Sequence, residues 1–168
     1  MKKEHNIIHI DWDGPYSLEE LSKVSDEVTD HGIYQIYGNH PIYGSTVLLY
    51  IGKAVKQTFG KRISQEKWGN TNNYELMQVY VGRLSGGFTP LEEIWSREIN
   101  LAEKLLIYAH KPAYNAMSVN QMPDKELNLV HILNWGMFNN LMPEVSGARW
   151  TSEYDDIPNY NVYGEHDE

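Results

Sequence analysis

Five cations lie between residues 53 and 67 against a single acid, Glu66, although the whole chain has a net charge of −9. Arg62 is the only arginine among them, and a guanidinium group matches phosphate oxygens with two parallel hydrogen bonds. Cleavage of a phosphodiester needs such a cation, an activated water and help for the leaving oxygen. We therefore interpret Arg62 as a residue that stabilises a phosphate, and a solvated arginine on a helix surface stays open as the alternative. The neighbouring cations are expected to contact a nucleic-acid backbone, and they are Lys56, Lys61 and Lys67.

Glu103 is the only acid between residues 100 and 113. A single carboxylate can hold one Mg²⁺, which keeps most of its waters and also binds a substrate phosphate. Glu103 lies at the border of the apolar stripe of a predicted helix, formed by Trp95, Ile99, Ala102 and Leu106. A metal ligand beside a sheet needs this position, although an ordinary boundary carboxylate would also occupy it.

Two tyrosines, Tyr34 and Tyr50, lie on neighbouring predicted strands, so their phenols can converge on one phosphate. A phenol with a pKa near 10 is a poor base unless a cation lowers that pKa, and Lys53 is placed to do so. Most tyrosines in strands simply pack against the sheet. Packing therefore stays open as an alternative for both residues.

The elements that must position these residues are predicted from apolar periodicity and turn signals. The predicted strands are 7–12, 33–37, 46–51 and 74–84, and the predicted helices are 18–28, 53–67 and 90–109. A capping box, Ser17 with Glu20, opens the first helix, and Thr89 is expected to cap the last one. Segment 127–135 suits either a strand or a buried helix. We predict an α/β (α+β) fold with a small, three-stranded, mostly antiparallel sheet flanked by helices.

The motifs on these elements resemble the GIY-YIG nuclease superfamily. Gly32-Ile33-Tyr34 and Tyr50-Ile51-Gly52 match its two signatures, and Lys111–Asn115 resembles its closing Pro-x-Tyr-Asn motif. The resemblance covers residues 31–116, about half of the chain. It implies a metal-dependent endonuclease that hydrolyses phosphodiester bonds, with DNA as the expected substrate and Mg²⁺, or Mn²⁺ in its place, as the cofactor.

The resemblance also implies roles for individual residues. Tyr34 and Tyr50 would act at the attacking water, Arg62 would stabilise the phosphate, and Glu103 would bind the metal. Three supporting residues would complete the site, Lys53, Asn115 and, as a departure from the family, Glu66.

The sequence departs from the family pattern at two places. Lys53 and Arg62 are nine positions apart, two more than the interval we associate with the repair nucleases. Many members carry a tyrosine or histidine four positions after the arginine, where this chain has Glu66. Glu66 is therefore a candidate base, a candidate second metal ligand or a sign of weak activity. His110, seven residues after Glu103, is a further candidate near the metal.

Four parts of the chain follow from these patterns: a lead with one helix (1–30), the nuclease-like core (31–116), a packing extension (117–150) and an acidic tail (151–168). The chain has no cysteine, and neither a membrane-spanning run nor a signal peptide is predicted, which favours the cytoplasm. Nucleic acid is the expected partner, together with either a protein partner or a second copy of the chain. The alternative function is a weak or inactive GIY-YIG-like module that binds or regulates with a partner protein.

Overall fold

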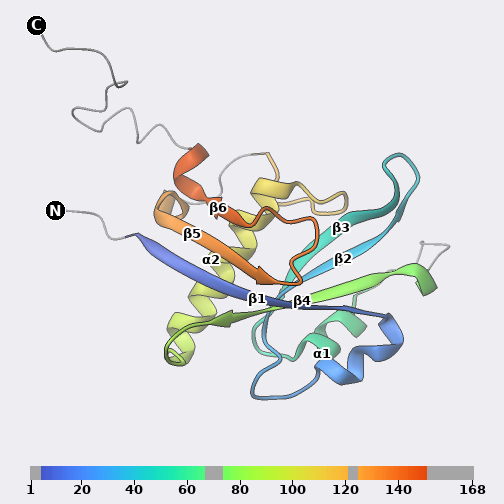
Figure 1. Cartoon of the computed structure of the whole chain (residues 1–168), viewed down its shortest axis with the longest axis horizontal. Helices are drawn as coiled ribbons and strands as arrows, with labels where there is room; N and C mark the ends of the chain where they lie inside the picture. Colours follow the sequence, from blue (N-terminus) through green and yellow to red (C-terminus); the bar gives the residue numbers. More distant parts are fainter. Residues whose placement is uncertain (1–4, 67–73, 121–124, 151–168) are drawn as a thin grey trace, which may run out of the picture.

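The computed structural model describes residues 5–66, 74–120 and 125–150, and it forms a mixed α/β fold around one sheet. Six strands of the described residues make up this sheet in the order β3-β2-β4-β1-β5-β6. Figure 1 shows that the sheet twists and curls along its length. The strands are β1 (Asn6–Tyr16), β2 (Gly32–His40), β3 (Gly44–Ala54), β4 (Gln78–Ser85), β5 (Val130–Gly136) and β6 (Glu144–Ser146).

The predicted three-stranded sheet is wrong, because the segments on both sides of the core add strands to it. The three expected strands are present as β2, β3 and β4, with β2 between the other two. β1 pairs antiparallel with β4 and parallel with β5, and β6 then pairs with β5. β1 joins the sheet because Ile8, Ile10 and Trp12 alternate along it and are all buried on one face.

Two apolar clusters cover the two faces of the sheet. On one face, α2 (Glu92–His110) packs Ile99, Ala102 and Leu106 against β1, β2 and β5. On the other face, the short helix α1 (Phe59–Ser64) and the 3₁₀ segment η1 (Leu18–Val24) pack against β2, β3 and β4. Phe59 and Ile63 are fully buried there, which is worth about 1.5–3 kcal/mol for each side chain.

Several predicted boundaries shift in the structure. Helix 18–28 is the shorter η1, although the Glu20 carboxylate does accept a hydrogen bond from the Ser17 N–H at 3.0 Å, as a capping box requires. α2 begins at Glu92 with Leu91 as its N-cap, so the predicted Thr89 cap is wrong. The ambiguous segment 127–135 is resolved as the end of the 3₁₀ segment η3 (Lys125–Leu129) followed by β5.

β3 is one of the two edge strands of the sheet, and the residues that follow α2 pair along part of its outer side. The Ala113 and Tyr114 N–H groups donate to the Leu48 and Leu49 carbonyls at 3.3 and 2.8 Å. The last turn of α2 therefore returns the chain to the strand that carries Tyr50. Within the described part of the chain, no helix is both long and apolar enough to span a membrane.

Candidate active site

The two motif tyrosines share one face of the β2–β3 pair. Tyr34 is paired with Gly52 and Ile36 with Tyr50, and directly opposite residues point to the same face of a sheet. The two phenol rings are tilted, with centroids 6.1 Å apart. The neighbouring strands do bring the two rings together, whereas the convergence of both phenols on one phosphate stays a prediction.

The glycines of the two motifs are required by close approach. A Cβ at Gly52 would lie 2.5 Å from the Tyr34 ring and hydroxyl and 2.7 Å from the Tyr50 ring. Gly32 has φ +148°, and a Cβ there would collide with the Gly82 carbonyl of β4. Gly52 thus leaves room for both rings, and Gly32 lets β2 approach β4.

Arg62 is brought to this edge by α1. The Thr58 hydroxyl caps that helix by accepting from the Lys61 N–H at 3.4 Å, and residues 55–58 take up the longer spacing between strand and helix. The Nη2 atom of Arg62 lies 2.7 Å from the carboxylate of Glu66, four residues later in the chain. Glu66 therefore occupies the guanidinium that is expected to bind phosphate.

Glu103 reaches the same edge from the opposite face of the sheet. Its neighbours Ala102 and Leu106 are buried, whereas its own carboxylate is partly exposed at the border, as predicted. Lys53, which is paired with Ile33 and so faces α2, holds that carboxylate at 2.7 Å. Two ion pairs thus lie at the β3 edge: Glu103 with Lys53 on the α2 side of the sheet, and Glu66 with Arg62 on the α1 side.

A pocket of about 260 Å³ lies between these elements. Its walls include the predicted site residues Tyr50, Lys53, Lys56, Arg62 and Glu103, and two that the sequence did not indicate, Val55 and Gln57. The Gln57 Oε1 atom is buried and lacks a hydrogen-bond partner among the described residues. No sequence signal marked Gln57, because a lone glutamine in a loop has no pattern.

Tyr34 lies behind the pocket rather than in its wall. Its side chain is fully buried, and its hydroxyl donates to the Glu66 carboxylate at 3.4 Å. Burial raises the pKa of the Tyr34 phenol, and Tyr50 and Glu66 nearby raise it further. The pKa of Tyr50 is also raised, first by burial and then by Glu66 and Glu103. Both residues are therefore phenols, not phenolates, at neutral pH.

The Asn115 side chain forms two hydrogen bonds with the backbone of β3. Its Oδ1 accepts from the Ile51 N–H at 3.0 Å, and its Nδ2 donates to the Ile51 carbonyl at 2.9 Å. These bonds fix the β3 backbone between Tyr50 and Gly52. Asn115 is accordingly a positioning residue, and it does not line the pocket.

The remaining predicted residues divide between the site and its surroundings. Lys56 lines the pocket and Lys61 is exposed on α1, whereas Lys67 and the acidic tail fall outside the described residues. Both ring nitrogens of His110 are engaged by backbone groups, so neither is available as a metal ligand beside Glu103. Nδ1 bonds to the Leu106 carbonyl at 2.9 Å, and Nε2 accepts from the Met142 N–H at 2.9 Å.

The oxygen atoms in the pocket suit a hard divalent cation. The Glu103 carboxylate and the partnerless Gln57 amide oxygen are both ligand types that Mg²⁺ prefers. Among the described residues, no three His, Cys, Asp or Glu side chains gather to hold a metal ion by themselves. The donor set therefore fits Mg²⁺ that keeps several waters, and it does not resemble an all-protein metal cage.

A scan against protein-family models finds no match to this chain, and searches of curated proteins and of solved structures find none either. The grounds for a function are therefore the residues and the geometry of the site itself.

Proposed function

We propose that this chain is a metal-dependent endonuclease of the GIY-YIG type, which hydrolyses phosphodiester bonds in nucleic acid, with DNA as its substrate. The observation that carries the proposal is the convergence of Tyr50, Lys53, Arg62 and Glu103 on one pocket from a strand and two helices. These are a phenol, two cations and a carboxylate, the groups that phosphodiester hydrolysis uses.

The substrate phosphate enters the pocket beside Arg62 and Lys56. Arg62 exchanges its Glu66 partner for the phosphate oxygens and stabilises the charge that develops on them. Glu103 and Gln57 would hold Mg²⁺, which when bound would supply further stabilisation of that charge. Lys53 is now paired with Glu103, and it would be available to the phosphate when that carboxylate serves as a metal ligand instead.

The attacking water is positioned by Tyr50, the motif tyrosine that reaches the pocket. Tyr34 acts from behind, where its hydroxyl donates to Glu66. Glu66, which accepts from Tyr34, becomes a carboxylate able to accept a proton once Arg62 has turned to the phosphate. This chain thus places a carboxylate where a tyrosine or histidine base was expected from the resemblance.

A substitution on α1 tests this assignment, because Arg62 and Lys61 are adjacent cations with different surroundings. Arg62 lines the pocket, and Lys61 is exposed outside it. Arg62→Ala should lower metal-dependent nicking of supercoiled plasmid by about 10²–10³-fold, the cost of losing one charge-stabilising donor. Lys61→Ala removes one expected contact to the nucleic-acid backbone, so it should weaken substrate binding with a far smaller loss of rate at saturating substrate. Equal rates for the two variants would contradict the role of Arg62.

A second candidate function is a binding or regulatory module without activity. It is favoured by one observation: two of the three cations that line the pocket, Lys53 and Arg62, are paired with acids in the chain itself. Such a module would bind DNA or a partner protein and would leave plasmid intact with Mg²⁺ or Mn²⁺. Any metal-dependent nicking that is lost in Arg62→Ala excludes it.

A further inference from the structure

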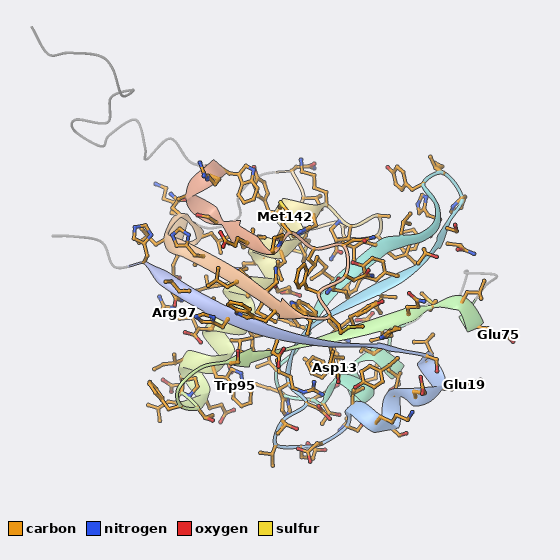
Figure 2. The ribbon with its side chains drawn as sticks, in the orientation of Figure 1. Asp13, Glu19, Glu75, Trp95, Arg97 and Met142 are labelled. Atoms are coloured by element: carbon orange, nitrogen blue, oxygen red, sulfur yellow. The ribbon has the colours of Figure 1, made fainter. Side chains whose placement is uncertain are left out.

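Two adjoining depressions lie around the first turns of α2, beside the pocket lined by Tyr50, Arg62 and Glu103, which is the proposed catalytic pocket. The larger, of about 770 Å³, runs between the start of β1, the end of β4 with its following loop, and α2. The smaller, of about 480 Å³, continues from it to the chain after β3, where Val55 and Lys56 also line the catalytic pocket. The two share four lining residues, which are Val28, Thr89, Pro90 and Trp95. We call this continuous feature the α2 groove, and Figure 2 labels Trp95 on the N-terminal part of α2.

The α2 groove exposes large apolar side chains. Phe88 is 84% exposed, Val28 is 75% exposed and Ile7 is 55% exposed, and the ring of Trp95 lies between the two depressions. A contiguous patch of exposed apolar surface on a folded protein often marks a site where another molecule binds. These side chains would be covered by an apolar anchor from a partner.

Acidic groups surround this apolar surface. Glu27 and Glu92 line the smaller depression, and Glu98 lines the larger one. The one arginine in the groove, Arg83, is already neutralised by the buried Asp30, whose Oδ1 accepts from its Nε at 3.0 Å. The groove is therefore acidic along its length, and Lys56 at the end next to the catalytic pocket is its remaining cation.

Two polar atoms or groups in the groove, the Glu98 carboxylate and the His31 Nδ1 atom, have no hydrogen-bond partner among the described residues. Glu98 makes no hydrogen bond or ion pair with a described residue, and burial raises the pKa of its carboxyl group, against the opposing charge of Arg97. His31 bonds through Nε2 to the Glu27 carbonyl at 3.0 Å, while its buried Nδ1 atom has no partner among the described residues. Trp95 therefore lies between two unsatisfied groups. On one side is the Glu98 carboxylate, which favours a cation, and on the other is the His31 nitrogen, which accepts a hydrogen bond.

We propose that the α2 groove binds a cationic peptide segment of a partner protein, with an apolar side chain seated against Trp95 and Phe88 and a lysine or arginine at Glu98. A donor on the peptide satisfies the His31 nitrogen. An indole ring also attracts a nearby ammonium or guanidinium group. The inference does not depend on nuclease activity, because none of Phe88, Trp95 and Glu98 lines the catalytic pocket.

Charge favours a cationic peptide in the α2 groove over a nucleic acid or a second copy of the chain. A nucleic-acid backbone would bring phosphates against Glu27, Glu92 and Glu98, which is unfavourable. A second copy would bring together two chains that each carry a net charge of −9. A basic segment gains from both the local acids and the net charge.

Peptide selection with matched variants tests the proposal. A phage-displayed library of random dodecapeptides is panned on the full-length chain, and enriched peptides are then titrated by fluorescence anisotropy. Phe88→Ser is compared with Ile42→Ser, since both residues are 84% exposed and Ile42 lies in the β2–β3 turn. Glu98→Lys is compared with Glu93→Lys, an exposed acid on the same helix outside the groove.

We expect enriched peptides in which lysine or arginine flanks an aromatic or aliphatic residue. Phe88→Ser and Glu98→Lys should each weaken their binding about tenfold or more, and each control should stay near the parent affinity. Four results would overturn the proposal: no enriched peptide, peptides without net positive charge, equal losses in the controls, or a dimer that Phe88→Ser dissociates. Binding of single-stranded DNA that Glu98→Lys strengthens and Phe88→Ser weakens would assign the groove to nucleic acid instead, and would also overturn it.

Discussion

The substitution Gly52→Ala adds one methyl group at the point where the two motif tyrosines meet. Its Cβ would lie 2.5 Å from the Tyr34 ring and hydroxyl and 2.7 Å from the Tyr50 ring, about 1 Å closer than an ordinary contact between carbon atoms. Tyr34 has no free space to retreat into, because it is fully buried. The rings or the β3 backbone must therefore move.

The size of this effect follows from packing. Overfilling a well-packed core costs about 1–3 kcal/mol, and for a chain of this length that lowers the melting temperature by about 2–12 °C. If Tyr50 positions the attacking water, a displacement near 1 Å also lowers the cleavage rate by about 10²-fold. Activity should then fall much further than the loss of stability explains.

The assay pairs thermal unfolding with plasmid nicking well below the melting temperature. Gly87→Ala is the matched control, because a Cβ at Gly87 would meet no atom within 4 Å. Parent-like stability and nicking in Gly52→Ala would refute the argument that this glycine makes room for the rings. Lower stability with full activity would leave the packing argument standing and refute the role of Tyr50.

Two further predictions concern residues beside the site. Burial lowers the pKa of His110, whose Nε2 accepts from the Met142 N–H, so the folded chain disfavours its protonated form. Its contribution to stability should be complete above pH of about 6.5 and should fall as the pH drops below that value, since the unfolded chain then binds more protons. Urea unfolding across this range checks it, and His110→Gln should flatten the dependence; an equal slope in both chains would refute it. Asn115→Ala removes two hydrogen bonds to the β3 backbone and should cost about 1–3 kcal/mol together with a drop in nicking. An unchanged unfolding midpoint would contradict its positioning role.

Much of the site could be predicted from the sequence because its residues lie on elements with strong local signals. The strands of Tyr34 and Tyr50 are rich in β-branched and aromatic residues, and the apolar stripe of α2 fixes which way Glu103 points. The pairing of Arg62 with Glu66 also follows from their i,i+4 spacing, although α1 itself ends at Ser64.

The rest depends on contacts between distant segments, which no local pattern encodes. The sequence predicts too few strands in the sheet because β1 pairs with β4 and β5, which lie about 70 and 120 residues further along the chain. The burial of Tyr34 behind Tyr50 depends on α1 closing over it, and the Asn115 clamp depends on α2 returning to the β3 edge. Gln57 lines the pocket only because of how residues 55–58 bend between strand and helix.

The most direct test of the proposed activity is nicking of supercoiled plasmid at low salt, with Mg²⁺ or Mn²⁺ against EDTA. Parent chain, Glu103→Ala and Glu93→Ala are compared, because both acids lie on α2 and only Glu103 lines the catalytic pocket. We expect metal-dependent nicking by the parent and by Glu93→Ala, and a loss of about 10²-fold or more in a folded Glu103→Ala chain. Nicking by Glu103→Ala at the parent rate, or nicking that persists in EDTA, would contradict the proposal that Glu103 holds a catalytic metal.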